Sequence, residues 1–448
     1  MHGQPMTPID TPPNTARPFW ASFGPGLLFA GAAVGVSHLI QSTRAGASYG
    51  LSMLLVVLLA NVVKFPSFRF GPHYAAVTGH SLLDGYRRQG RWTLVIFSLL
   101  TLGTMFTVTA VVTLVTSGVA ISVFGLERPL SAITGPEHLP LAVSAFLMAC
   151  SAILLSLGGY KLLDRFMKVV MPLLVVSTFA AMALALGGIN WSFSALLPGG
   201  LLDDPAAILF MVALIGWMPS PIDISVWSSL WTLARKKQQQ AQGTLRSALA
   251  DFDAGYLATL LLALAFVLMG AGLMFGRGLA FENNAARFAT QVVDLYATTL
   301  GEWCRPLVGG IAFLVMLSTT VTVIDGFPRV ISALLEQIRI SIFSNNESQS
   351  TEGSKFAYRC SFAILTAGAL GILAWGMSSF TALVDLATTL SFVTAPVLSI
   401  FNHRAVFSDA IPASMRPSGT MWAWSLTGIA LQSAFTIYFF WIKFAHPL

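Results

Sequence analysis

The chain has 448 residues, of which 55% are hydrophobic and only 10% are charged, and its formal net charge is +6. Soluble proteins carry roughly 25% charged residues, so this composition excludes an ordinary soluble protein and indicates an integral membrane protein. Apolar runs of about 20 residues are typical of helices that cross a hydrocarbon core of roughly 30 Å, whereas a membrane β-barrel would show short alternating strands. The lipid bilayer is the expected partner, and no nucleic-acid partner is expected.

The hydropathy pattern predicts an all-α, polytopic protein with eleven transmembrane helices, of which the first and sixth are broken. The letters GVSH, from Gly35 to His38, interrupt the first helix, and GWMPSP, from Gly216 to Pro221, interrupts the sixth. Interrupted hydrophobic segments in corresponding halves of a chain indicate the substrate site of a secondary transporter. The spans are expected near 20–47, 49–68, 93–124, 139–158, 167–188, 205–233, 252–275, 304–325, 357–375, 379–402 and 419–442.

The span pattern also predicts the domain organisation. Residues 1–18 are rich in Pro and Thr and lack the apolar core of a signal peptide, so we expect a disordered cytoplasmic tail. The remainder, 19–448, is expected to be a single transmembrane transporter domain. Spans one to five and six to ten have similar lengths, and each set opens with a broken helix, which suggests a 5+5 inverted repeat. Its parts are repeat one at about 20–188, repeat two at about 205–402 and an extra helix at about 419–442.

The basic residues predict the orientation, because cytoplasmic loops of membrane proteins carry an excess of Lys and Arg. Most Lys and Arg residues in the connections fall on the side of the N-terminus, including Arg87, Arg88 and the run Arg235–Lys237. The N-terminus is therefore expected in the cytoplasm and, after eleven spans, the C-terminus outside. The expected location is the plasma or inner membrane.

Several motifs resemble the Nramp (natural resistance-associated macrophage protein) divalent metal transporters, in order along the chain. Residues 24–28 (GPGLL) and 45–50 (AGASYG) are similar to the first helix of the family, and Met218-Pro219 stands where its sixth helix has Met-Pro-His-Asn. Residues 317–320 (LSTT) and 390–396 (LSFVTAP) resemble helices 8 and 10. The resemblance implies a LeuT-like fold and secondary-active symport of a divalent metal cation, such as Mn²⁺, Fe²⁺ or Mg²⁺, by alternating access.

The chain departs from the family at the residues that hold the metal. The first helix of the family breaks at Asp-Pro-Gly-Asn, whose Asp and Asn bind the metal, and these two positions are Gly35 and His38 here. The metal-binding Met of helix 6 aligns with Met218, but the His-Asn that follows it is replaced by Ser220 and Pro221. The resemblance therefore implies a substituted and atypical metal site.

Three further positions also differ from the family at residues with a functional role. The paired acids of helix 3, which the family associates with proton movement, align with Ala110 and Thr113, and the Gln of helix 10 aligns with Thr394. The scaffold of the family is thus present without its acidic groups.

The candidate site collects the donor groups near the two breaks. A divalent cation that leaves water needs oxygen, nitrogen or sulfur ligands and usually at least one negative charge. Asp223 could supply that charge, or it could pair with Arg44 or His38 or cap the second half of helix 6. The candidate metal ligands are His38, Met218 and Asp223, and the candidate substrate-binding residues are Gly35, Ser37, His38, Met218, Ser220, Asp223 and Thr394.

Each of these residues also has a purely structural interpretation. His38 could be a hydrogen-bonded histidine that packs the break, and Met218 could fill the apolar core. Hydroxyl side chains often serve helix packing in membranes. Pro219, Pro221 and Gly35 are expected to shape the breaks, because proline removes a backbone donor and glycine has a permissive backbone.

No enzymatic activity is expected, because the sequence has neither a P-loop nor a helix with His-Glu-x-x-His. No cofactor is expected either, and a divalent metal ion would be the substrate. The alternative is a small organic or anionic solute on the same scaffold, since the positive N-termini of half-helices favour anionic groups. A third interpretation is a non-transporting sensor. The substrate, the coupling ion, the direction of transport and the oligomeric state stay open.

Overall fold

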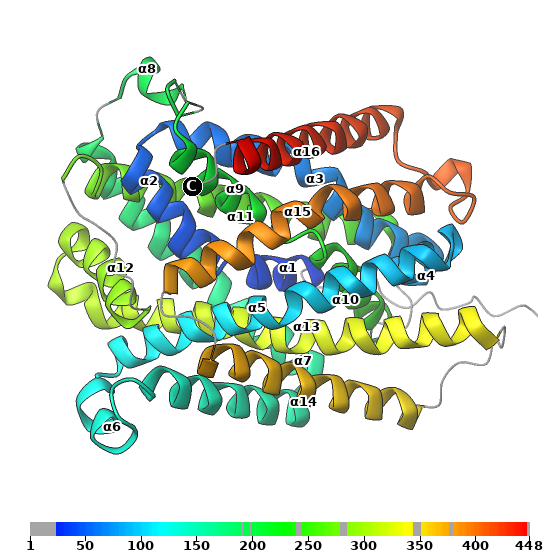
Figure 1. Ribbon diagram of the computed structural model, residues 1–448, viewed down its shortest axis with the longest axis horizontal. Helices are drawn as coiled ribbons and strands as arrows, with labels where there is room; N and C mark the ends of the chain where they lie inside the picture. Colours follow the sequence, from blue (N-terminus) through cyan, green and yellow to red (C-terminus); the bar gives the residue numbers. More distant parts are fainter. Residues whose placement is uncertain are drawn as a thin grey trace, which may run out of the picture.

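The computed structural model describes residues 24–189, 191–197, 199–201, 203–238, 244–277, 285–343, 351–375 and 380–445. The predicted tail, residues 1–18, lies outside these ranges. In the described part of the chain, long helices run side by side in one bundle (Figure 1). Within these described ranges, ten helical segments are long and apolar enough to cross a membrane. Together with the split sixth span they account for the predicted eleven.

The first and sixth spans are broken as predicted. The first consists of α1 (Pro25–Ala33), a π-helical segment (Val36–Ser42) and α2 (Thr43–Tyr49). The sixth consists of α9 (Pro205–Gly216) and α10 (Ile224–Gln238), which are separated by seven non-helical residues, 217–223.

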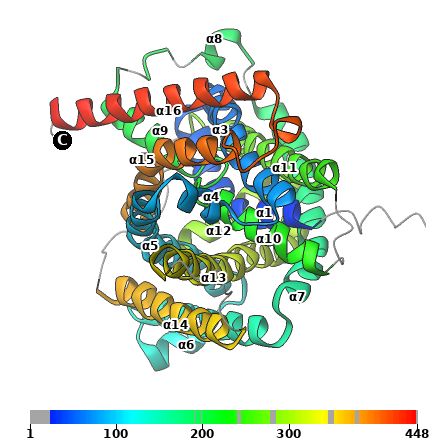
Figure 2. The same ribbon diagram turned by 90° about the vertical axis from the view of Figure 1, so that its right-hand side faces the viewer.

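The unbroken spans surround these two segments. Viewed along the bundle, α1 and α10 lie near the centre, while α14 and α16 lie at opposite margins (Figure 2). Helix α7 and the short 3-10 turn after it, Leu186–Gly188, hold two membrane-length segments, Leu139–Ser156 and Met167–Gly188, which correspond to the fourth and fifth predicted spans. The long helices are α3 (Ser52–Thr78), α5 (Arg91–Val123), α7 (Leu139–Ala185), α11 (Leu245–Leu273), α13 (Arg305–Phe343), α14 (Thr351–Trp375), α15 (Phe380–Val406) and α16 (Gly419–Ala445).

Small residues let the first span approach α11 closely. A Cβ atom on Gly46 would lie 1.9 Å from the main-chain oxygen of Val267, and one on Gly255 would lie 2.2 Å from that of Gly26. Helix interfaces in membranes favour small residues for this reason, because backbones in direct contact gain van der Waals packing. The broken first span is thereby held against α11 on both sides of its break.

Short helices in the connections were not predicted. They are α4 (Leu82–Gln89), α6 (Glu127–Thr134), α8 (Phe193–Leu196) and α12 (Ala285–Leu300). Helix α12 buries Phe288, Val292 and Tyr296, which are spaced four residues apart and so lie on one face. Its remaining positions are mixed, so a search for long apolar spans does not detect it.

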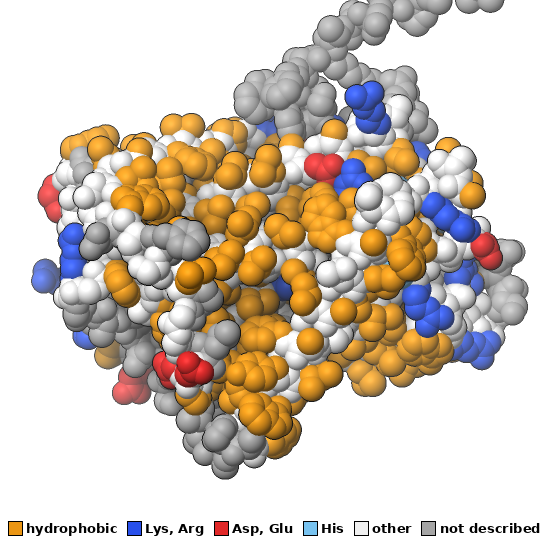
Figure 3. Space-filling view, turned by 90° about the horizontal axis from the view of Figure 1, so that it is seen from above, with side chains coloured by type: hydrophobic (Ala, Val, Ile, Leu, Met, Phe, Trp, Pro, Cys, Tyr) orange, Lys and Arg blue, Asp and Glu red, His pale blue; other side chains and the backbone are white. Residues whose placement is uncertain are grey.

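The surface matches a membrane environment. In Figure 3 the visible band between the two ends is mainly hydrophobic, and most charged side chains lie toward the ends. Large apolar side chains are exposed on the membrane-length helices, among them Leu99, Phe146, Val176 and Ile437. A bilayer would cover such side chains, which are costly to leave in water.

Candidate functional site

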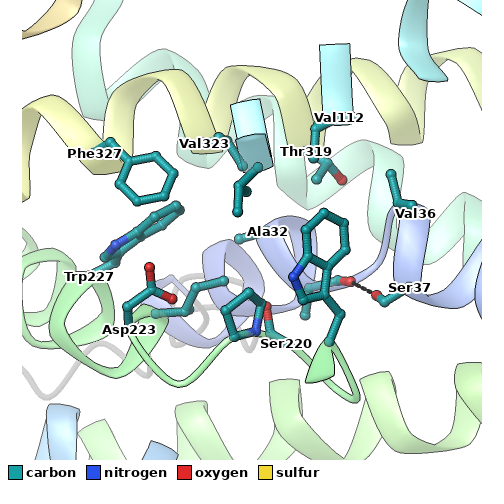
Figure 4. Close-up of a pocket in the computed structure, with 15 residues that line it drawn as sticks. Ala32, Val36, Ser37, Val112, Ser220, Asp223, Trp227, Thr319, Val323 and Phe327 are labelled. Atoms are coloured by element: carbon teal, nitrogen blue, oxygen red, sulfur yellow. Dashed lines mark hydrogen bonds between the residues drawn. The ribbon is translucent and has the colours of Figure 1, made fainter. Parts of the chain in front are cut away.

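A small cavity lies between the two breaks (Figure 4). The volume that the centres of water molecules can occupy in it is about 20 Å³, which is room for roughly one or two waters. Its lining residues come from the first and sixth spans and from α5 and α13: Ala32, Ala33, Val36, Ser37, Val108, Val112, Trp217, Ser220, Pro221, Asp223, Ile224, Trp227, Thr319, Val323 and Phe327. The cavity is therefore small and mostly apolar.

The break of the first span is held by Thr319 of α13. The Thr319 hydroxyl lies 2.9 Å from the main-chain oxygen of Gly31 and 3.1 Å from that of Val34, and it can donate to either. A Cβ atom on Gly35 would lie only 2.6 Å from the same hydroxyl oxygen. Gly35 therefore contributes to the site by the absence of a side chain, because Thr319 occupies the adjacent space.

Asp223 is the acidic side chain among the described residues that line this cavity. Only 7% of its surface is exposed, and its Oδ1 atom has no hydrogen-bond partner in the described part of the chain. The indole nitrogen of Trp227, four residues further along, is also buried without a partner. An unpaired acceptor and an unpaired donor on one wall indicate a polar ligand or ordered water between the breaks.

Thr394 lies beside a second, smaller cavity, which Asp223 and Pro221 also line. Ser391 in this cavity accepts a hydrogen bond from the indole nitrogen of Trp217, at 2.8 Å. Asp223 thus stands between the two cavities, and Thr394 is near the main one without lining it.

The side chains of Ser37 and His38 contact each other, but only Ser37 lines the main cavity. Ser37 lines the main cavity, and its hydroxyl lies 2.7 Å from the main-chain oxygen of Ala33. The His38 ring is fully buried, with Nδ1 2.8 Å from the Ser37 hydroxyl and Nε2 3.0 Å from the main-chain oxygen of Thr259 on α11. His38 therefore ties the break to α11 and does not line the cavity.

Met218 is also turned away from the cavity. It is fully buried in an apolar cluster that includes Ala45, Val57, Val212 and Phe392. Of the three candidate metal ligands, Asp223 alone therefore lines the main cavity. Within the described residues no group of three or more His, Cys, Asp or Glu side chains is placed to hold a metal ion.

The remaining candidates divide in the same way. Ser220 and Pro221 line the main cavity, whereas Pro219 lines neither cavity.

The sequence interpretation missed the aromatic wall formed by Trp217, Trp227 and Phe327, in which the Trp227 and Phe327 ring centroids lie 4.8 Å apart. A usable signal was present, because residues four apart on a helix share a face, and Trp227 lies four positions after Asp223.

Polar contacts close the first span at both ends. At one end, Nη1 of Arg44 lies 2.9 Å from Oε1 of Gln41 and 3.3 Å from Oδ1 of Asp385, and the guanidinium carbon lies 5.2 Å from the centre of the Phe210 ring. Asp223 is therefore not the partner of Arg44, one of the options that the sequence left open.

At the other end, the carboxylate of Asp251 accepts hydrogen bonds from the main-chain nitrogens of Gly24 and Gly26, each at 3.0 Å. Arg235 of α10 donates to the same carboxylate at 3.1 Å. These contacts join the start of the first span to both α11 and the second half of the sixth. Along the first span, one of these polar clusters comes before the break and the other comes after it.

The chain is similar in sequence to an uncharacterized protein and in fold to several solved structures. PM0681 of Pasteurella multocida (strain Pm70), an uncharacterized protein, is 34% identical over 422 residues, which cover 94% of this chain and 92% of PM0681. A mutant of the Eremococcus coleocola manganese transporter matches with a TM-score of 0.66 at 10% identity, covering 98% of this chain and 91% of that chain. MhsT in complex with L-phenylalanine matches with a TM-score of 0.63 at 17% identity, covering 93% and 97%.

The structural matches show the LeuT-like fold, as predicted. The family model described as natural resistance-associated macrophage protein-like matches residues 26–442. That match spans both breaks and nearly all of the helices described above. This multi-pass membrane protein therefore belongs to the Nramp family of transporters.

Proposed function

We propose that this protein is a secondary-active transporter that moves a divalent metal cation by alternating access and binds it beside Asp223. The observation that carries the proposal is the buried Asp223 carboxylate, whose Oδ1 atom is unpaired and which lines the cavity between the two broken spans. An ionisable group at this depth is expensive to bury without a function or a partner. A bound cation would supply the missing partner.

With one carboxylate among the described lining residues, the donor set suits a cation that keeps part of its water shell, and the cavity, which has room here for one or two waters, would have to widen to admit it. Besides Asp223, the side-chain oxygens that line the cavity are the hydroxyls of Ser37, Ser220 and Thr319, and the Thr319 hydroxyl is already bonded to main-chain oxygens of the first span. Metal-bound waters could donate hydrogen bonds to Asp223. A further water, not bound to the metal, could accept from the Trp227 indole, whose donor has no partner among the described residues. Magnesium and similar hard cations bind oxygen ligands and retain waters readily.

We also propose that the N-terminus is cytoplasmic and the C-terminus outside. This orientation places the Asp251 cluster, which we call the inner gate, on the cytoplasmic side and the Arg44–Asp385 cluster, the outer gate, on the other. Alternating access then consists of opening one polar cluster while the other stays closed.

Each gate can be weakened by one substitution. Asp251→Asn removes the charge that the Gly24 and Gly26 amides and Arg235 share, and Asp385→Asn removes the charge that faces Arg44. We expect Asp251→Asn to raise labelling of Ala32→Cys, in a background with Cys150, Cys304 and Cys360 replaced, by an impermeant thiol reagent from the cytoplasmic side. Asp385→Asn should raise labelling from the other side. Equal changes from both sides would contradict this assignment.

A second candidate is a small organic cation, because the aromatic wall offers ring faces to a positive group. Cation–π contacts with Trp or Phe contribute roughly 0.5–2 kcal/mol, and Trp227 and Phe327 lie on the same wall as Asp223. An anionic solute is not favoured, because Asp223 is acidic and Arg44 is engaged by Asp385 outside this cavity.

Uptake into proteoliposomes tests these candidates together. We expect the purified protein to accumulate Mn²⁺ or Mg²⁺ down an imposed gradient, with empty liposomes as the control. Accumulation of primary or quaternary ammonium ions without any metal flux would select the second candidate. A lack of flux for both classes, with retained binding in a thermal-shift assay, would favour the sensor interpretation.

A further inference from the structure

Lys64 is buried within the membrane-spanning helix α3, and only 1% of its surface is exposed. Its Nζ atom donates hydrogen bonds to the main-chain oxygen of Ile215 at 2.5 Å and to that of Gly216 at 3.2 Å. These carbonyl groups end α9, at the point where the sixth span breaks. Because a lysine inside the membrane is expensive without a partner, this end of α9 is the group that stabilises it.

The described residues around Lys64 provide no competing anion. Within the described part of the chain Lys64 forms no ion pair with an acidic side chain. The neighbouring cavity is lined by apolar side chains, with Gln432 the other polar residue, and Gln432 itself donates to the main-chain oxygen of Gly428. The C-terminus of a helix carries about half a negative charge, so the end of α9 is the negative pole that faces Lys64.

In secondary transporters, the freed carbonyls and C-terminal ends of half-helices coordinate the coupling cation. We propose that Lys64 is a tethered cation in this position: its ammonium group neutralises the C-terminal end of α9 and fixes that half-helix to α3. The break then needs no exchangeable cation at this end. Lys64 is a positioning residue, because it lies outside the substrate cavity and acts through the conformation of α9.

Three substitutions separate charge, hydrogen bonding and shape. Lys64→Arg keeps charge and donors, Lys64→Gln keeps N–H donors without charge, and Lys64→Met keeps length alone. In the purified full-length protein without substrate, we expect the melting temperature of Lys64→Arg to stay close to that of wild type. Lys64→Gln and Lys64→Met should lower the melting temperature by about 5–10 °C. The cavity beside Lys64 has about 320 Å³ for water centres, so the larger Arg side chain can be accommodated.

The yield of monodisperse protein is scored with the melting temperature, so a variant that does not fold takes the lowest rank. A Gln variant equal to wild type would show that hydrogen-bond donors suffice and would overturn the proposal. An equal loss in all three variants would show that only the shape of lysine matters and would overturn it too.

Chemical rescue gives an independent measurement. Lys64→Ala leaves space beside an apolar cavity, and n-propylammonium carries the same charged group on a short apolar stem. We expect n-propylammonium to restore at least half of the lost melting temperature in Lys64→Ala and to leave wild type unchanged, while n-propanol has no effect. Equal rescue by the alcohol would contradict the role of charge. Both assays are done without transport substrate. A negative result in them would therefore not count against the proposed cation transport, and a negative transport result would not change their interpretation.

Discussion

Asp223→Asn is expected to lower metal binding and uptake by at least about 100-fold while leaving the empty protein as stable as wild type or more so. Removing the charged partner of a buried ion costs roughly 3–5 kcal/mol, and each 1.4 kcal/mol is a factor of ten in affinity. Without substrate, however, the carboxylate is buried with an unpaired oxygen, which opposes folding. The same substitution should therefore act in opposite directions on binding and on stability.

Titration calorimetry with Mn²⁺ and Mg²⁺ measures the affinity, and the melting temperature of the apoprotein measures the stability. Asp409→Asn is the matched control, because the Asp409 side chain is fully exposed and lines neither cavity. It should change neither quantity. A substrate that binds Asp223→Asn as tightly as wild type would place the cation elsewhere.

Gly35→Ala is expected to destabilise the protein by about 2–4 kcal/mol, although it adds a single methyl group. Its Cβ would lie 2.6 Å from the Thr319 hydroxyl oxygen and 2.8 Å from its methyl carbon, and overpacking of this kind typically costs a few kcal/mol. Gly103→Ala is the matched control, because nothing lies within 4 Å of a Cβ there. That substitution should be neutral or slightly stabilising, since alanine favours helix. Thermal unfolding in detergent compares the two.

The clash can be relieved on the other side. In Gly35→Ala/Thr319→Ala, the two nearest Thr319 atoms are absent, so the double variant should be more stable than the sum of the two single effects predicts. Additive effects would show that Thr319 does not limit position 35.

The double variant Gly35→Asp/Thr319→Ala would place a second carboxylate in the cavity, at the position where other Nramp proteins have their aspartate. We expect that variant to bind Mn²⁺ more tightly than wild type.

The sequence alone determined the membrane class, the spans and the two breaks. These features are local, because a membrane helix needs about 20 consecutive apolar residues and the polar or proline-containing interruptions are visible within a few letters. The short helices α4 and α12 were not predicted, because their apolar residues are spread along one face and form no long apolar run. The division into two repeats remains a prediction, and so does the orientation with a cytoplasmic N-terminus and a C-terminus outside.

Tertiary structure decided which of the predicted residues line the cavity. Neighbouring residues on a helix point about 100° apart, so Ser37 lines the cavity while His38 bonds to α11, and the same local sequence is compatible with the opposite choice. Met218 likewise lies in the apolar core, while Asp223 reaches the cavity. The partner of Lys64 is about 150 residues away in the chain. Such pairings depend on how the helices pack, which no local pattern records, and so the breaks were found from sequence while their chemistry was not.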